Sequence, residues 1–279
     1  MPPQRDSWVR VAPDGTRLAL GYDDPTAQIA LWNIRNTTFT VLRLSSVSFP
    51  NGPVWTPSGD RLLFQARVPN GPANIWWVSA DGSDAAERLT TTESNPQRPT
   101  GTSPDGSKVI FMEARPSLDV MELALDSSRT VRELIHMPGS FEAGGVISPD
   151  GRWLTYESDA SGRLEVYVCS YPDVTKSSTP VTTGGAGAPR WLAKTGRELF
   201  FATLEGTLMR ASVEYTGATV QFGTPTRVLD LTVLAGSTYG AQDIAPDGRI
   251  VVIKRTATPP EVNVVLNWNL ELARLVPMK

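Results

Sequence analysis

The chain has few side chains of the kind that carry out chemistry. It contains one histidine, His136, and one cysteine, Cys169, in 279 residues. Histidine is the usual general base, but no carboxylate accompanies His136 within residues 134–138, so we expect a structural or loop histidine. Cys169 lies in an alternating apolar run, which favours a small buried hydrophobe over a nucleophile. One histidine and one cysteine cannot supply the usual zinc site, and a single cysteine forms no internal disulfide.

Three further patterns would indicate chemistry if they were complete. Asp-Gly pairs recur, but none is followed by the evenly spaced oxygen ligands and final bidentate carboxylate of a calcium loop. The glycine-rich residues 183–189 lack the lysine and the following helix of a phosphate-binding loop, so we interpret them as a connecting loop. No Gly-x-Ser-x-Gly pentapeptide is present, although serine hydrolases of the α/β class require one. We therefore expect no catalytic residue, no metal and no cofactor.

The Asp-Gly pairs are explained by a turn that recurs along the chain. Proline presets φ, aspartate bonds its own backbone and glycine accepts φ > 0, so Pro-Asp-Gly between two apolar segments predicts a hairpin. The turn glycines are Gly15, Gly59, Gly106, Gly151, Gly196 and Gly248, which are 44 to 52 residues apart. The copy at 193–196 has lost both the proline and the aspartate. The spacing predicts six repeats.

Each repeat contains four short segments rich in β-branched and aromatic residues, a pattern typical of strands. Six units of about 45 residues with four antiparallel strands each predict an all-β fold, a six-bladed β-propeller, with residues 1–279 forming a single domain. The approximate blades are residues 7–43, 52–90, 98–135, 144–182, 187–230 and 239–276. In the last unit, residues 270–276 are as compatible with a helical turn or two as with a strand.

Composition limits the partners. The formal charge is −3, the pI is near 5.4, and the lysines and arginines are scattered, so we expect no nucleic-acid partner. No apolar run approaches 18 residues and the first residues lack a signal-peptide core, so we expect no membrane insertion. We also expect a monomer. The absence of disulfides is compatible with cytoplasm and periplasm alike, so the compartment stays open.

The repeats resemble a known family. Residues 55–64, then 74–82 with Ile75 and Asp81-Gly82, then 87–90 with Leu89-Thr90 are similar to the WD-like blades of TolB-type propellers. This resemblance implies a binding scaffold, periplasmic if the analogy holds. Residues 262–277 separately resemble the tail of propellers fused behind bacterial serine/threonine kinase or winged-helix domains, which implies a ligand-sensing domain. Propellers of this type also cap prolyl-oligopeptidase-type enzymes, so a peptidase accessory domain, a hydrolase or a lyase is the alternative of another class.

The best candidate site lies in the connections from each fourth strand to the next first strand. In a propeller these connections surround one mouth of the central channel, and loops on a rigid scaffold commonly carry binding residues. We predict that a protein or peptide binds there. The candidate residues are Phe49, Asn95, Gln97, Arg98, Phe141, Glu142, Arg190 and Tyr239.

Overall fold

The computed structural model describes residues 5–23, 28–44, 46–176, 178–232 and 242–253. Within these ranges all regular secondary structure is β-strand, so the all-β prediction is confirmed. Among the same residues, none forms a helix of the length and apolarity that a membrane crossing requires. Tyr239 and the third and fourth segments of the sixth repeat lie outside the described residues.

The strands form one small sheet per repeat. Blade 1 contains β1 (Arg5–Val11), β2 (Arg17–Asp23), β3 (Ile29–Asn33) and β4 (Phe39–Val41); blade 2 contains β5 (Ser48–Trp55), β6 (Arg61–Arg67), β7 (Ala73–Ser79) and β8 (Glu87–Arg88). Blade 3 contains β9 (Gln97–Thr102), β10 (Lys108–Ala114), β11 (Leu118–Ala124) and β12 (Val131–Ile135); blade 4 contains β13 (Glu142–Ile147), β14 (Trp153–Ser158), β15 (Glu165–Ser170) and β16 (Thr179–Pro180). Blade 5 contains β17 (Ala186–Trp191), β18 (Glu198–Thr203), β19 (Thr207–Thr216), β20 (Thr219–Phe222) and β21 (Thr226–Asp230), and the final sheet contains β22 (Gln242–Ile244) and β23 (Ile250–Val252).

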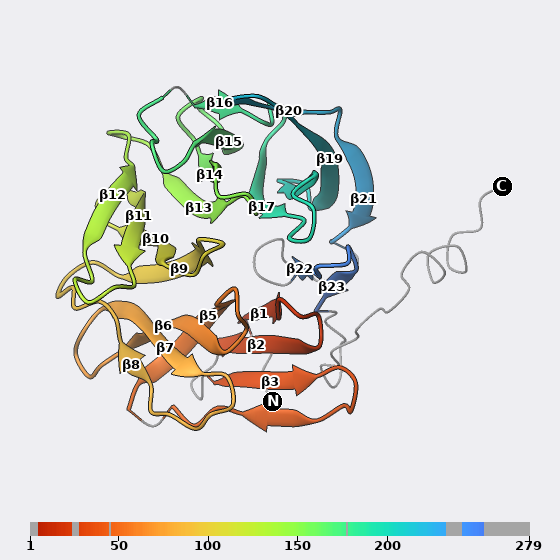
Figure 1. Ribbon diagram of the computed structural model, residues 1–279. Coiled ribbons are helices and arrows are strands. Elements are labelled where there is room, and N and C mark those ends of the chain that lie inside the picture. Colours follow the sequence, from red (N-terminus) through yellow and green to blue (C-terminus); the bar gives the residue numbers. More distant parts are fainter. Residues whose placement is uncertain (1–4, 24–27, 45, 177, 233–241, 254–279) are drawn as a thin grey trace.

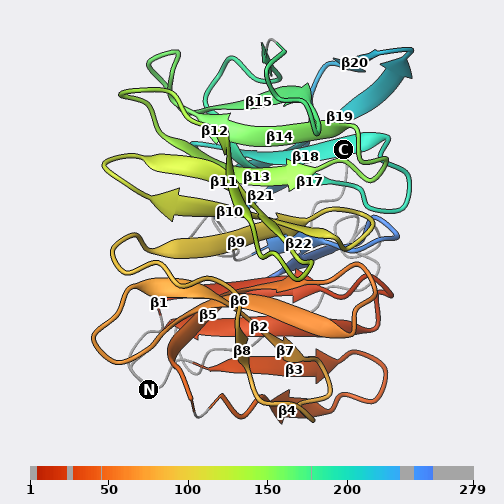
Figure 2. The ribbon, with the colours of Figure 1, turned by 60° about the vertical axis from the view of Figure 1, so that its left-hand side comes forward.

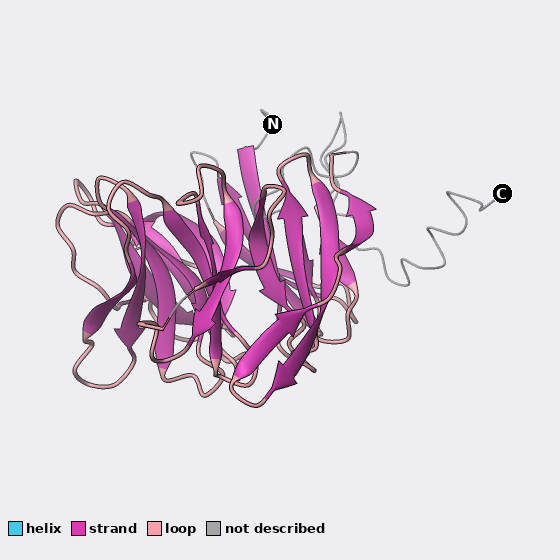
Figure 3. Cartoon of the chain, turned by 90° about the horizontal axis from the view of Figure 1, so that it is seen from above, coloured by secondary structure: helices cyan, strands magenta, loops and turns pink. Residues whose placement is uncertain are grey.

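The sheets are arranged around a common axis, as Figure 1 shows. The first strands lie nearest that axis, and β1 contacts β5, β5 contacts β9, β9 contacts β13, and β13 contacts β17. The β22–β23 sheet lies between blades 5 and 1, and β22 contacts β1. Figure 2 shows the stacking of successive sheets, and Figure 3 shows loops at both ends of the strands. The fold is therefore a β-propeller.

The recurring turns hold one end of the ring together. All six turn glycines have positive φ, between 61° and 86°, as the sequence predicts. Neighbouring turns touch: a Cβ placed on Gly59 would lie 3.5 Å from Cδ of Pro13, and one on Gly106 would lie 3.7 Å from Cδ of Pro57. The same contact joins Gly15 to Pro246 at 3.9 Å, across the point where the chain closes on itself. We call this end of the propeller the turn end and the opposite end the rim end.

The apolar core is divided among the interfaces between blades. Each pair of successive blades from 1 to 5 encloses a cluster of buried side chains, with Phe64 between blades 1 and 2, Phe111 between blades 2 and 3, and Tyr156 between blades 3 and 4. A further cluster combines Val9 of blade 1 with Ile250 of β23 and residues of blade 5. Because both faces of a blade are covered, its central strands are nearly continuous apolar runs.

Three details differ from the sequence prediction. The first strands begin earlier than expected, so Phe49, Gln97, Arg98 and Glu142 belong to strands and not to connecting loops, and Arg190 also lies in a strand. In blade 5, β19 is long enough to pair with both β20 and β21, which gives an additional strand that the four-strand pattern did not include. The described residues contain five sheets of four or more strands and one two-stranded sheet, so six complete blades are not shown.

Candidate functional site

First strands run from the rim end to the turn end, so the described candidate residues lie near the rim end, except Arg190, which is the second-last residue of β17 and lies toward the turn end. Each of these strands starts beside the axis and is kinked by a bulge or irregular pairing after its first residues. Bulges direct side chains away from the regular pleat. The structure places Asn95, Gln97, Arg98, Phe141 and Glu142 along the beginnings of β9 and β13. Tyr239 cannot be placed, because it lies outside the described residues.

Asn95 and Gln97 are brought together by a carboxylate that the sequence analysis missed. Nδ2 of Asn95 donates to Oε1 of Glu113 at 3.3 Å, and Nε2 of Gln97 donates to Oε2 of the same residue at 2.5 Å. The Thr90 hydroxyl donates to the Gln97 Oε1 atom at 2.5 Å. Gln97 and Glu113 are buried, so these bonds fix the side chains instead of leaving them free in solvent. Gln97 is therefore a supporting residue and is not itself an exposed contact.

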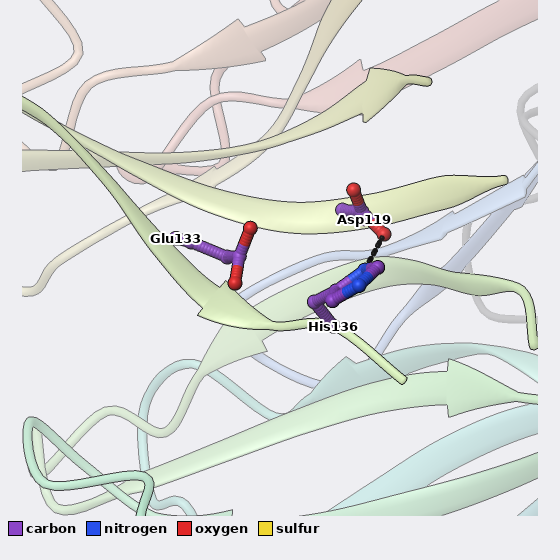
Figure 4. A group of neighbouring side chains, drawn as sticks. All are labelled: Asp119, Glu133 and His136. Atoms are coloured by element: carbon purple, nitrogen blue, oxygen red, sulfur yellow. Dashed lines mark hydrogen bonds and ion pairs between the residues drawn. The ribbon is translucent and has the colours of Figure 1, made fainter. Parts of the chain in front are cut away.

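His136 has a carboxylate partner, which corrects the prediction of an isolated imidazole. Nδ1 of His136 lies 2.8 Å from Oδ1 of Asp119, as Figure 4 shows. Asp119 is the second residue of β11 and is fully buried, whereas His136 follows β12 and keeps 38% of its side chain exposed. The hydrogen bond to Asp119 raises the pKa of His136 above its usual value, with Glu133 and Glu142 adding to the effect. The pair is an accessible imidazole held by a buried carboxylate.

Arg115 lies among the carboxylates of blade 3. Its Nε donates to Oε1 of Glu113 at 2.9 Å, and its Nη1 donates to Oε2 of Glu133 at 2.8 Å. The same Nε is 3.6 Å from Oδ2 of Asp119. These contacts raise the pKa of Arg115, first through its hydrogen bond to Glu113. One guanidinium therefore links three acidic side chains at the rim end of blade 3.

The possibility of a cation site can be tested on this cluster. Ligand atoms of Asp119, Glu133 and His136 lie within 4.8 Å of one another (Figure 4). Arg115 already occupies both carboxylates as a counterion, and a metal ion would have to displace that guanidinium. Charge neutralisation by arginine explains the acidic cluster without a metal.

Glu142 lies in the neighbouring blade and is also fully buried. Its Oε2 accepts a hydrogen bond from the Met137 backbone N–H at 3.0 Å, and its Oε1 accepts one from the Ser158 hydroxyl at 3.1 Å. Burial raises the pKa of the Glu142 carboxyl, and the negative charges of Asp119 and Asp159 act in the same direction. Like Gln97, Glu142 shapes the segment that precedes its strand and is not an exposed contact. Its predicted role as a contact residue stays untested.

The exposed candidates are aromatic or cationic. Phe49 is 52% exposed and has φ of +55°, a conformation that a bulky non-glycine residue seldom adopts. Phe141 is half-buried and its backbone N–H donates to Oδ1 of Asp159 at 2.8 Å. Arg98 extends from blade 3 across Gly52 of blade 2, and its guanidinium carbon lies 4.8 Å from the centre of the Trp8 ring in blade 1. These side chains present mixed apolar and cationic character near the axis.

Arg190 completes the described part of the candidate set. Its Nη1 donates to the carbonyl of Pro189 at 2.8 Å, and its Nε lies 3.8 Å from Oδ1 of Asp243 in β22. This ion pair joins blade 5 to the β22–β23 sheet. Arg190 and Arg98 thus lie in different blades and both extend toward residues of a neighbouring sheet.

The residues that the sequence analysis missed are Glu113, Arg115, Asp119 and Glu133. They come from three successive strands and the loop between two of them, so only the folded hairpins bring them together. One signal was present in the repeat: Asn74, Asp119 and Glu165 occupy the same position at the start of their third strands, opposite Ala66, Glu113 and Ser158. All three are buried. A polar residue at a repeated core position indicates a hydrogen-bonding network.

Comparison with known proteins supports the fold. No family model matches the chain, and no curated protein matches its sequence. A protein assigned as TolB from Agrobacterium tumefaciens has a similar structure, with a TM-score of 0.69, 18% identity, and coverage of 89% of this chain and 88% of that chain. TolB from Acinetobacter baumannii gives a TM-score of 0.62 and 21% identity over 80% of this chain and 57% of that one. An oligogalacturonate lyase in complex with manganese gives 0.59 and 14% identity, over 92% and 73% of the two chains.

The chain is thus similar to TolB-like β-propellers in its architecture. The same architecture also occurs in the lyase and in a periplasmic gluconolactonase from Pseudomonas aeruginosa. At these identities the likeness concerns the fold, because function depends on the residues that each propeller carries at its site.

Proposed function

We propose that this chain is a six-bladed TolB-like propeller that acts as a non-catalytic scaffold and binds a protein or peptide segment at the rim end, near the axis. The observation that carries the proposal is Phe49. This residue is 52% exposed while its backbone has φ of +55°. Strained backbone persists where the surrounding structure imposes it, and such strain is concentrated at functional sites. An exposed aromatic ring on a rigid scaffold is suited to a peptide.

Rigidity of the rim end is a second support. The segments that carry the exposed side chains are held in place by hydrogen bonds between buried polar side chains, such as Gln97 with Glu113 and Glu142 with Ser158. A site that is already ordered loses little conformational entropy when a ligand binds. This rigidity favours a binding role for these segments over that of solvent-exposed loops that bind nothing.

The proposal of six blades has its own support. The β22–β23 hairpin occupies the position of an inner hairpin, its turn glycine Gly248 has positive φ, and Val9 and Ile250 share one apolar cluster with blade 5. Two strands alone would leave an exposed sheet edge, which natural proteins avoid. We propose that residues beyond 253 complete this blade.

The binding proposal is tested by comparing two phenylalanines of nearly equal exposure. Phe49 is 52% exposed at the rim end, and Phe39 is 53% exposed on the edge strand β4. Affinity capture of partners from lysate of the source organism, followed by titration of each purified partner, should show at least about tenfold weaker binding for Phe49→Ser. Phe39→Ser should bind as the wild type does. Equal binding by both variants would contradict the proposal.

An enzymatic role is the second candidate, and one observation favours it. The His136–Asp119 pair combines an accessible imidazole with a buried carboxylate, which is the arrangement of a general base and its orienting group. Two propellers of similar fold are named as a lyase and a lactonase. Turnover of oligogalacturonates or a sugar lactone by the wild type, abolished in His136→Asn, would establish this candidate and displace the scaffold.

The ligand-sensing alternative depends on the resemblance of residues 262–277 to propellers attached to bacterial kinases or winged-helix regulators. Those residues lie outside the described part of the chain, so this alternative stays a prediction.

A further inference from the structure

A cavity of about 500 Å³ lies on the outer strands of blade 4. Its lining comes from three segments: the loop between β14 and β15 with Arg163, the strand β15 with Glu165 and Tyr167, and the residues after β16 with Thr182 and Thr183. Because β14 runs back from the turn end and β15 starts where it finishes, the cavity lies at the rim end. None of the described candidate residues lines it. We call it the blade 4 pocket.

The walls of the blade 4 pocket are held together by Glu165, which is buried. Its Oε2 accepts a hydrogen bond from the Thr182 hydroxyl at 2.6 Å. Its Oε1 accepts from the Gly185 N–H at 2.8 Å and from Nε of Arg163 at 3.2 Å. Nη2 of Arg163 in turn donates to the Thr183 carbonyl. All three segments are therefore fixed before a ligand arrives, and binding does not require the walls to become ordered.

The charges in the blade 4 pocket do not favour an anion. Arg163 is the one cationic side chain of the lining, and its Nε lies 3.2 Å from Oε1 of Glu165. Glu205 is a second carboxylate within electrostatic range of Arg163. Since two carboxylates face one guanidinium, a phosphate or a uronate would meet no surplus of positive charge. The charges therefore favour an uncharged ligand.

Hydrogen-bonding groups make up most of the lining. Of the eight residues that line the pocket, only Gly162 and Pro180 lack a polar side-chain atom. Among the described residues, neither the Tyr167 hydroxyl nor Nη1 of Arg163 has a hydrogen-bond partner. A single amino-acid side chain carries too few polar atoms to match such a lining, and polar groups covered without partners weaken binding. A ligand with many hydroxyl groups matches it, because each hydroxyl both donates and accepts.

Tyr167 supplies an aromatic surface in this polar lining. It is half-buried, and its ring is stacked on that of Tyr156, with ring centres 5.7 Å apart and planes 23° apart. The stacking fixes the ring in place. The face of an aromatic ring is negative and attracts weakly positive groups. The C–H groups on one face of a pyranose ring are of this kind, whereas its hydroxyls point outward.

We propose that the blade 4 pocket binds a neutral saccharide, with one sugar ring packed against Tyr167 and its hydroxyls bonded to Arg163 and Thr183. This site is separate from the peptide site proposed near the axis and goes beyond that function. It also differs from a site for acidic sugars, because its two carboxylates disfavour them.

The experiment uses the full chain and three neutral trisaccharides, maltotriose, cellotriose and tri-N-acetylchitotriose. Trigalacturonate, which has three sugar rings and three carboxylates, is the charged control. Binding is followed by the backbone ¹⁵N–¹H signals of Gly162 and Thr183. We expect at least one neutral trisaccharide to shift these signals saturably and to bind at least about tenfold more tightly than trigalacturonate at pH 7.

Variants of the lining test which groups act. Tyr167→Leu should weaken binding of the neutral trisaccharide about tenfold, whereas Tyr167→Phe, which keeps the ring, should weaken it less. Thr183→Val keeps the shape of the side chain and should weaken binding about fivefold through loss of one hydroxyl. Thr40→Val is the matched control, because Thr40 is exposed on β4 of blade 1 and should leave binding unchanged. If Tyr167→Leu lowers the melting temperature, Thr183→Val still tests the site.

The outcomes separate this inference from the proposed function. Absence of a saturable shift with all three neutral trisaccharides, or equal loss in Thr183→Val and Thr40→Val, would overturn the saccharide site. Equal or tighter binding of trigalacturonate would overturn the assignment to a neutral ligand. Loss of the protein partners in Tyr167→Leu, without saccharide binding by the wild type, would show that the pocket extends the peptide site instead. Saccharide binding that persists in Phe49→Ser would support two independent sites.

Discussion

Asp119 and His136 are 17 positions apart in the chain, yet Oδ1 of the first lies 2.8 Å from Nδ1 of the second. Pairing of β11 with β12 produces this contact, because Asp119 lies near the start of β11 and His136 directly follows β12. The pair is surrounded by Arg115, Glu133 and Glu142, so its electrostatics depend on the whole rim end of blades 3 and 4.

We expect Asp119→Asn to lower the pKa of His136, because it removes the hydrogen bond that is the main cause of the raised value. The raised pKa means that protonation of His136 favours folding. This contribution is fully present below about pH 6.5, the ordinary histidine pKa, and is lost as pH rises through the folded pKa. Titration of the imidazole by NMR gives the shift. As pH rises from about 6.5 through the folded pKa of His136, the urea midpoint of the wild type should fall more steeply than that of His136→Asn. Equal pH dependence of the two urea midpoints would contradict this linkage.

Trp191 joins blades 4 and 5 by a buried hydrogen bond, in which its Nε1 donates to Oγ1 of Thr155 at 3.1 Å. Trp191→Phe should lower the free energy of unfolding by about 1 kcal/mol beyond the loss of apolar area, the usual worth of such a bond. Trp153→Phe is the control, because Nε1 of Trp153 is buried without a partner among the described residues and its removal should cost less. Denaturant unfolding of both variants measures the difference. A larger loss for Trp153→Phe would show that this assignment is wrong.

Gly145 is a position where blades 3 and 4 approach closely. A Cβ at this residue would lie 2.7 Å from Cγ1 of Val120 and 2.8 Å from Cγ2 of Ile110. Gly145→Ala should therefore destabilise the fold by about 1–3 kcal/mol through overpacking. Gly184→Ala should have little effect, since nothing lies within 4 Å of its added methyl group. Thermal unfolding distinguishes the two, and equal melting temperatures would argue against tight packing between these blades.

Cys169 should be inert in the folded protein. It is buried between blades, and burial raises the pKa of its thiol to about 12, so the reactive thiolate is scarce at neutral pH. A thiol-specific chromogenic reagent should react with less than one thiol per chain over an hour at pH 8 and with one thiol after unfolding in guanidinium. Rapid reaction without denaturant would show that blade 4 opens readily.

The sequence predicted the propeller because its information is local and repeated. Four consecutive residues determine each turn at Gly15 or Gly151, and the structure confirms the predicted positive φ of both glycines. Even the altered copy forms a turn, but there the N–H of Gly196 bonds to Leu192 across one more residue than in the other blades. The extra strand β20 was missed because the four-segment pattern of the other repeats has no strand between the third segment and the fourth, which in this repeat is β21.

The candidate site was predicted less completely, because its contacts join segments that are distant in sequence. Asn95 and Arg98 were found from their place before a first strand, but nothing near them indicates Glu113 or Trp8. His136 was judged by its own neighbours in the chain, whereas its partner lies on another strand.

The turn end and the rim end of the propeller differ in their contacts. At the turn end, contacts such as Pro13 with Gly59 recur between neighbouring turns, whereas no such repeated contact is described at the rim end. Selection can therefore exchange Phe49, Arg98 or Phe141 one at a time while the frame stays intact. The frame can therefore persist while the residues at the opposite end differ, which is consistent with propellers of one architecture that share fewer than a quarter of their residues.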